Sequence, residues 1–295
     1  MRNREDIESV ARQLRLGRLG EMAVTTARRS LRLSVNDNDS VELKSGSSKF
    51  GGYPDMPSGF IWPDSSPLRS GKKVHYDPHQ YAVGPMRFIA QINLAEVPLV
   101  PEGLALPAHG IISFFAAAQK VDLPFTDCDT DDWKVLFHSD VDVLVRLEEP
   151  PLSDEFINLN RQFTDMPFGS DGSIILPERA ISFVEDFVPN PAIFYGSDCG
   201  PELVEAYFLR SPEHLLGGYP NYLQCPIEPI ADDFRRLESR WKGKANSEWL
   251  LLAQFDTDKR VGLTWAGGGR GFFMIPKDAL EGQKFEETIL VVQQT

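Results

Sequence analysis

Four polar side chains recur at matching places in the two halves of this sequence, and groups arranged in this way could bind a ligand. Gln91 and Asn93 lie two residues apart in one apolar run, and Gln254 and Asp256 lie two residues apart in another. Residues two apart share one face of a β-strand, so each pair would lie together. Polar side chains that are buried need hydrogen-bond partners. We therefore consider two interpretations, a ligand groove between these side chains and a folding duplication without a site.

Two tryptophans and two histidines lie close to these repeated segments. Trp62 and Trp265 each adjoin a predicted turn, where an indole could wall a groove for a sugar or a peptide, or fill the core. His109 and His214 are the histidines placed for acid–base chemistry, although a histidine at a turn also serves simply as a hydrogen-bonding group. These four residues complete the candidate ligand-binding set.

Common catalytic and metal-binding motifs are absent from the sequence. There is no Gly-x-Ser-x-Gly elbow, no Walker loop and no His-Glu-x-x-His pair. The three cysteines are far apart and odd in number, which favours free thiols over a zinc site or a disulfide framework. We therefore expect no catalytic residue, no metal and no cofactor, and we favour a protein that is not an enzyme.

An acidic segment is the candidate surface for contact with another protein. Eleven acids and only two bases lie between Val121 and Glu155. The run lacks the glycine and the later glutamate that a calcium loop of the EF-hand type requires. Such crowding costs self-repulsion, which a cationic surface would relieve. The predicted contacts with a basic protein partner are Asp127, Asp129, Asp131 and Asp132.

The overall charge agrees with a basic partner and argues against nucleic acid. The formal net charge is −13 and the pI is near 4.9, so the whole protein would repel a phosphate backbone. The N-terminus is polar and charged, and no apolar run is long enough to cross a membrane. These features predict a cytoplasmic protein that binds neither nucleic acid nor membranes.

Periodic patterns predict a mainly β (α+β) protein with a few helices. Residues 3–16 carry apolar side chains at helical spacing behind Asn3, a suitable N-cap, and a second helix is predicted at 153–163. In residues 86–94 every second side chain is apolar, so we expect Met86 and all the following alternate residues to share one face. The other predicted strands are 31–35, 111–116, 133–138, 141–147, 249–255, 271–275 and 288–293.

A repeated order of motifs indicates two copies of one β module. Gly51–Pro54 (Gly-Gly-Tyr-Pro) recurs as Gly217–Pro220, and each copy is followed by the polar strand motif and then by a glycine–aromatic strand. We expect the Gly-Gly steps to have positive φ or to approach another backbone closely. Two such modules would pack about a pseudo-twofold axis into one compact unit. The predicted divisions are an N-terminal helical segment at 1–35, a first β module at 36–150 and a second β module at 151–295.

The combination of these motifs resembles a known family. The segments that carry the resemblance are Ser48–Pro54, Phe60–Pro63, Phe88–Leu94, Leu106–Gly110 with Phe114 and Phe115, and His214–Pro220. They are similar to the YwqG-like domain of unknown function, and the similarity runs from about Leu31 to Gln294. This resemblance implies a bacterial cytosolic protein with a mainly β, roll-like fold and no established activity. Family members often lie near polymorphic toxins, which implies an immunity or protein-binding role. The chain departs from the family pattern at Trp265–Gly269, where the family tends to have Trp-Gly-Asp.

Two functions from different classes follow from these observations. The favoured hypothesis is a non-enzymatic protein-binding module, immunity-like, that binds a basic protein such as a toxin. The alternative is a small-ligand binding protein or an enzyme that uses a cleft between the two repeats. A surface patch away from any cleft would favour the first hypothesis, whereas a deep pocket lined by Gln91, Gln254 and a histidine would favour the second.

Overall fold

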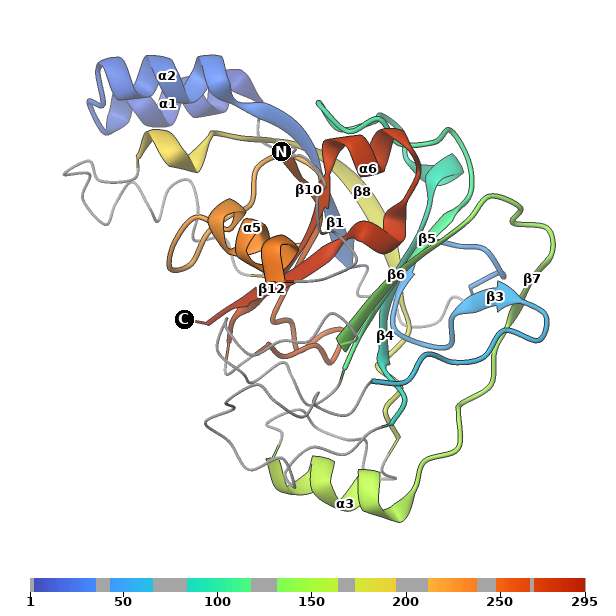
Figure 1. Cartoon of the computed structure of the whole chain (residues 1–295). Helices are drawn as coiled ribbons and strands as arrows, with labels where there is room; N and C mark the ends of the chain where they lie inside the picture. The colour runs from blue at the N-terminus through green and yellow to red at the C-terminus, as the bar shows by residue number, and fades with distance from the viewer. Residues whose placement is uncertain are drawn as a thin grey trace.

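A near-closed antiparallel sheet of ten strands forms the body of the computed structural model, and two helices project from one end of it (Figure 1). The structure describes residues 3–35, 43–65, 84–117, 132–163, 173–194, 212–237, 248–265 and 268–294. The spatial order of the strands is β12-β11-β10-β9-β1-β8-β2-β4-β5-β6, and β3 and β7 form a separate two-stranded sheet. The mainly β fold with a few helices that the sequence predicts is confirmed.

The strands and helices have the following bounds. The strands are β1 (Arg28–Val35), β2 (Lys49–Phe50), β3 (Asp55–Pro57), β4 (Arg87–Asn93), β5 (Ile111–Ala116), β6 (Trp133–His138), β7 (Leu144–Arg146), β8 (Arg179–Val188), β9 (Leu215–Leu216), β10 (Trp249–Asp256), β11 (Arg270–Pro276) and β12 (Ile289–Gln293). The α-helices in the described residues are α1 (Arg4–Gln13), α2 (Arg18–Thr26), α3 (Asp154–Phe163), α5 (Glu228–Leu237) and α6 (Lys277–Glu281). The short 3-10 helices are η2 (Leu94–Glu96), η5 (Pro191–Ile193) and η7 (Phe285–Glu287).

The strand order is symmetric about the pair β1 and β8. Outward from β8 lie β2, β4, β5 and β6, and outward from β1 lie their counterparts β9, β10, β11 and β12. The backbone amide of Leu33 donates to the carbonyl of His214 (2.8 Å), and that of Ile181 donates in the same way to Ser48 (3.2 Å). Leu33 and Ile181 are therefore equivalent. Because the next residues, Ser34 and Ser182, pair with each other, a pseudo-twofold axis passes between them.

The first strand of each half pairs with the other half. In the sequence β1 precedes β2 and β8 precedes β9, yet in the sheet β1 lies beside β9 and β8 lies beside β2. The two halves have thus exchanged their first strands. The strand at residues 28–35 belongs to the centre of the sheet, although it lies within the predicted N-terminal helical segment.

Aromatic side chains fill the space that the curved sheet encloses. The Phe114 ring lies 5.1 Å from that of Phe255 and 5.0 Å from that of Phe273, so strands of both halves meet in one core. The two edge strands also approach each other, because the indole Nε1 of Trp133 donates to the Thr288 carbonyl over 2.8 Å. This contact links the start of β6 to the residue before β12.

A β-bulge corrects one sequence expectation. The pairing of β4 with β5 shifts register between Phe88 and Ala90, and a bulge of this kind turns the side chains that follow it to the opposite face. Phe88 consequently packs in a satellite core with Trp62, whereas Ala90 and Ile92 lie in the main core. The expectation that alternate residues from Met86 onwards share one face is wrong. The pairing of β10 with β11 shifts at the equivalent place, between Leu251 and Ala253.

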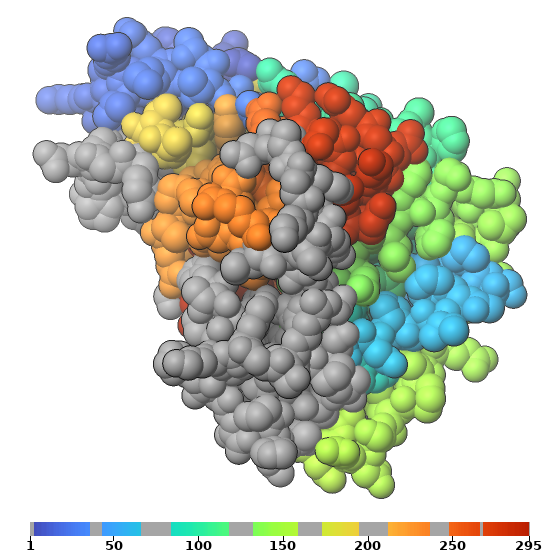
Figure 2. Space-filling view, viewed as in Figure 1, coloured from blue at the N-terminus to red at the C-terminus, as the bar shows by residue number. Residues whose placement is uncertain are grey.

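Local sequence explains the N-terminal helix. Asn3 accepts a hydrogen bond from the Asp6 amide, and the Asp6 carboxylate accepts one from the Asn3 amide, so the two residues form a capping box. Ile7 and Ala11 bury the apolar face of α1 against α2, where Gly20 permits the close approach. Figure 2 shows α1 and α2 as a lobe at one end of the molecule.

Candidate functional site

The Gly-Gly-Tyr-Pro loops adopt the same conformation in both halves. Their glycines all have positive φ, at 55° and 66° in the first loop and 68° and 82° in the second, as predicted. The amide of Gly51 donates to the Ile89 carbonyl (2.9 Å), and the amide of Gly217 donates to the Leu252 carbonyl (3.2 Å). Ile89 and Leu252 are the bulge residues of β4 and β10, so each loop rests on a bulge.

Gln91 fastens the first loop to β4. Its Oε1 accepts a hydrogen bond from the Asp55 amide (3.0 Å), and its Nε2 donates to the Ser47 carbonyl (2.9 Å) and to Asp55 Oδ2 (2.6 Å). The side chain is fully buried. Donors and acceptor of this amide are therefore engaged with the chain itself, on either side of the loop.

Gln254 makes the equivalent contacts in the second half. Its Oε1 accepts from the Asn221 amide (2.9 Å), and its Nε2 donates to the Glu213 carbonyl (3.1 Å). Asn221 and Glu213 stand in the places that Asp55 and Ser47 occupy in the first half. The repeated glutamine thus holds the loop in both halves.

Asn93 and Asp256 are also repeated, but their partners differ. The Asn93 amide donates to Ser48 Oγ (2.9 Å), whereas the Asp256 amide donates to His214 Nδ1 (3.1 Å). The Asn93 side chain donates to the Gly46 carbonyl (2.7 Å). His214 therefore replaces a serine hydroxyl as the acceptor for a backbone amide.

The hydrogen bonds of His214 fix its tautomer. Because Nδ1 accepts from a backbone N–H, the ring proton lies on Nε2, which faces Asp258 Oδ2 at 3.2 Å. Burial raises the pKa of Asp258, but the hydrogen bonds from His214 and Arg260 outweigh that effect and hold its pKa below the usual range. The imidazole is buried with both nitrogens engaged, which is the geometry of a structural histidine rather than of an open acid–base group.

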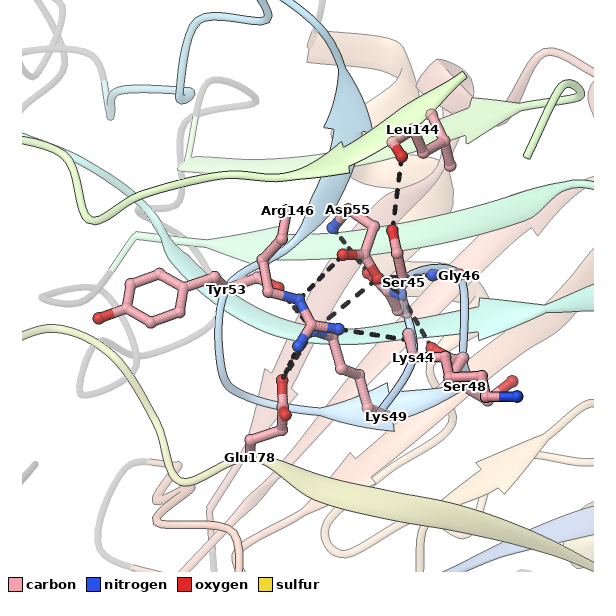
Figure 3. Close-up of polar contacts among 12 residues, drawn as sticks. Lys44, Ser45, Gly46, Ser48, Lys49, Tyr53, Asp55, Leu144, Arg146 and Glu178 are labelled. Carbon is pink, nitrogen blue, oxygen red and sulfur yellow. Dashed lines mark hydrogen bonds and ion pairs between the residues drawn. The ribbon is translucent and has the colours of Figure 1, made fainter. Parts of the chain in front are cut away.

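A partly buried charge cluster lies beside the first loop (Figure 3). Lys49 Nζ donates to the Tyr53 carbonyl (2.6 Å) and to Glu178 Oε2 (2.8 Å). Arg146 Nε donates to Asp55 Oδ1 over 3.1 Å. The four charged side chains come from β2, β3, β7 and the residue before β8, and Figure 3 shows them pointing toward one another.

The two positive and two negative charges of this cluster compensate one another. Burial lowers the pKa of Lys49 although Glu178 and Asp55 oppose the change. Burial also raises the pKa of Asp55, but the hydrogen bond from Arg146 and the charge of Lys49 outweigh it, so that the pKa lies below the usual range. The Lys49 side chain is fully buried, so the cluster pins β2, β3 and β7 together and offers no exposed amine for chemistry.

A surface hollow of about 550 Å³ lies where the chain leaves β3 and β7. Its floor includes Trp62, whose ring packs edge-on against Phe115 at 6.0 Å and whose Nε1 donates to the Met86 carbonyl over 2.7 Å. The charged side chains in the lining, Asp64 and Glu148, are both acidic. The remaining lining residues are Phe60, Ile61, Gly84, Pro85, Leu147, Pro150, Pro151, Ser153 and Phe156.

One protein-family model matches nearly the whole of the main sheet. The model of a family described as a domain of unknown function, DUF1963, matches residues 48–293. The chain belongs to this family. The DUF1963 match includes every strand of the main sheet except β1, which lies before it in the sequence and nevertheless occupies the centre of the sheet. No curated protein matches the chain.

The repeated polar side chains of the predicted ligand-binding set form their hydrogen bonds within their own half of the DUF1963 fold. Gln91 and Asn93 are held within the first half, and Gln254, Asp256 and His214 within the second. Trp265 is buried in the main core, His109 is exposed, and Trp62 lines the surface hollow.

The predicted acidic contacts lie mostly beyond the described residues. Asp127, Asp129 and Asp131 fall in the stretch 118–131, outside them. Asp132 is described and is only 2% exposed. Within the described residues, no group of three or more His, Cys, Asp or Glu side chains could hold a metal ion, and no helix is long and apolar enough to cross a membrane.

Sequence reasoning missed the charge cluster and the hollow. Both are assembled from residues far apart in the chain, such as Lys49, Arg146 and Glu178, and no local pattern joins them. One signal was available in the sequence. When the two repeats are aligned, Lys49 falls at the position of Leu215, so the first half has a lysine where the second half has a core leucine.

Proposed function

We propose that this protein is a non-enzymatic, immunity-like module that binds a basic protein such as a toxin. The observation that carries the proposal is that the repeated polar side chains are buried and hydrogen-bonded within the chain. Gln91, Gln254 and His214, which a ligand cleft between the repeats would need, are buried and already hydrogen-bonded to the chain itself. With a formal net charge of −13, binding then depends on the surface, where a cationic partner is attracted.

The proposal has further parts that rest on the sequence alone. They are a YwqG-like identity within DUF1963, a cytoplasmic location in a bacterium, and the absence of any cofactor. The three aspartates of residues 118–131, Asp127, Asp129 and Asp131, remain proposed partner contacts, whereas the buried Asp132 is dropped from that set.

The test measures binding of the purified product of the adjacent gene. Electrostatic steering acts mainly on the association rate and is screened by salt, so that rate should fall steeply as ionic strength rises from about 0.05 to 0.5 M. Changing the three aspartates to asparagine should reduce the association rate. The matched control changes three exposed acids of the helical lobe, Glu5, Glu8 and Glu21, to glutamine, which alters the net charge equally.

One outcome would remove the proposed contacts, and another would contradict the proposed function. Equal losses in both triple variants would show that only the overall charge matters and would remove the aspartates as contacts. Absence of binding, together with turnover or tight binding of a small molecule, would favour the alternative of a ligand-binding protein or enzyme.

A further inference from the structure

The surface hollow is preformed by packing underneath it. Asp64 forms an isolated β-bridge with Pro85, which joins two of its walls. Phe156, at the start of α3, packs so closely on Gly84 that an added Cβ would overlap its ring. Trp62 and Phe156 both belong to the satellite core beneath the floor. A binding site that is already built loses little conformational entropy when it is filled.

Ile61 stands at the rim of this hollow in an unusual environment. It is 85% exposed, far more than any other large apolar side chain in the described residues. Its neighbours Phe60 and Trp62 both turn into the lining. Ile61 thereby extends the apolar lining of the hollow, and contiguous exposed apolar surface is typical of contact sites, whereas a single exposed apolar side chain is not.

The hydrogen-bonding groups of the lining are mostly acceptors. Asp64 and Glu148 supply exposed carboxylates. The three prolines of the lining have no amide N–H. The Trp62 Nε1 proton is already donated to Met86, and Ser153 Oγ accepts from the Phe156 amide, so the Ser153 hydroxyl is the one side-chain donor left in the lining. An occupant that supplies cationic donors would therefore complement the hollow.

We propose that this hollow is the docking site for an extended segment of the partner protein that carries an apolar side chain next to a lysine or arginine. The inference rests on the proposed function and locates its binding site. The volume, about 550 Å³, accommodates several side chains but not a folded domain. The apolar side chain packs between Trp62 and Ile61, and the cation lies near Glu148 and Asp64.

The experiment uses the full chain and a phage-displayed library of random dodecapeptides as the probe. Enriched peptides should combine an apolar or aromatic residue with a nearby lysine or arginine. A synthetic peptide of the enriched sequence should then bind Ile61→Ser roughly tenfold more weakly than the unaltered protein. It should bind Glu148→Gln about threefold more weakly, with a reduced dependence on salt.

Matched controls separate the site from the general surface. Val143→Ser removes an apolar side chain that is 54% exposed but does not line the hollow. Glu149→Gln removes the neighbouring charge, which also lies outside the lining. Both controls should bind the peptide within about twofold of the unaltered protein, because neither contacts the segment. All these side chains are exposed, so the fold should survive each change.

Several results would overturn the inference. Acidic peptides, no enrichment, or equal losses in the controls would each exclude the proposed docking chemistry. Self-association that is abolished by Ile61→Ser would assign the hollow to a second copy of this chain. If the adjacent gene product binds the unaltered protein and Ile61→Ser equally, the proposed function stands and only this site is wrong. If neither the gene product nor any peptide binds, both fail.

Discussion

A single glutamine in each half connects a strand to the loop that crosses it. Gln91 and Gln254 replace water as hydrogen-bond partners for backbone groups that the loop buries, including the amides of Asp55 and Asn221. A buried donor or acceptor without a partner costs about 1–3 kcal/mol. The repeated polar side chains are therefore explained by backbone satisfaction, which needs no external ligand.

Removing the amide should lower stability in either half. We expect Gln254→Ala to reduce the free energy of unfolding by at least about 2 kcal/mol, because the Asn221 amide and the Glu213 carbonyl lose their partner. Urea denaturation would measure this change. Gln13→Ala, on the exposed face of α1, should change the free energy by less than about 0.5 kcal/mol. Similar losses in the two variants would refute a structural role for Gln254.

The Asp55 carboxylate should make stability depend on pH. Its pKa is depressed in the folded protein, so ionised Asp55 contributes stability above the unfolded pKa of about 3.9, and this contribution is lost as the pH falls through the folded pKa. Asp55→Asn should therefore be less stable than the unaltered protein at pH 7, by about 2 kcal/mol, and the difference should narrow below about pH 4. Urea denaturation between pH 7 and pH 3 would show this. The exposed Asp142→Asn serves as the control, and a constant difference across the range would contradict the expectation.

At the scale of elements, each Gly-Gly loop combines positive φ with close packing. A Cβ on Gly51 would overlap the carbonyl of Pro177 and the backbone of Leu176, and a Cβ on Gly217 would overlap Pro101. Glycine tolerates both constraints because it has no side chain. Glycine is thus required at these positions for two reasons: the backbone has a positive φ, and there is no room for a side chain.

Two substitutions separate those requirements. Gly103 has a φ of 85° but nothing within 4 Å of the Cβ position, so Gly103→Ala should cost about 1 kcal/mol through backbone strain alone. Gly51→Ala should cost at least about 1 kcal/mol more, because it adds the overlap with Pro177. Thermal or chemical unfolding would measure both. Equal costs would mean that the neighbouring backbone moves aside without penalty.

Local periodicity predicted many of the strands, and it failed where contacts between distant segments determine the position or the faces of a strand. The strands at 111–116 and 133–138 occur with the predicted bounds. The predicted strand at 141–147 shortens to β7 and leaves the main sheet, and β8 was not predicted. Only three of the ten residues of β8 are buried, and the apolar alternation that marks a strand is weak there. The bulge in β4 also leaves no local signal, so its two faces could not be assigned.

At the scale of the whole molecule, the repeat was visible but its connectivity was not. Matching motifs order the residues of each half, yet nothing in them indicates which half a strand joins. The pairing of Leu31 with Leu216 spans nearly two hundred residues and involves side chains with no distinctive chemistry. The surface hollow could not be predicted for the same reason, because its walls come from segments far apart in the sequence, 60–64, 84–85 and 147–156. Sequence therefore gives the modules, while three-dimensional packing gives the exchange and the hollow.

The exchange of first strands makes each half dependent on the other. A break after residue 168 would give one fragment with β1 to β7 and another with β8 to β12. In the first fragment β1 loses both of its neighbours, β8 and β9, and in the second β8 loses both β1 and β2. We expect neither fragment to fold alone, because unpaired buried strands leave backbone groups without hydrogen bonds. When they are expressed together, the fragments should form a one-to-one complex that unfolds cooperatively.

Purification through a tag on one fragment, followed by circular dichroism and thermal unfolding, would test this expectation. Leu31→Asp places a charge at a fully buried position of β1, between β8 and β9, and should prevent assembly of the complex. Met22→Asp, on the exposed side of α2, should leave assembly intact. A folded monomer of either fragment would contradict the dependence, because it would show that one half can complete its sheet without the strand supplied by the other.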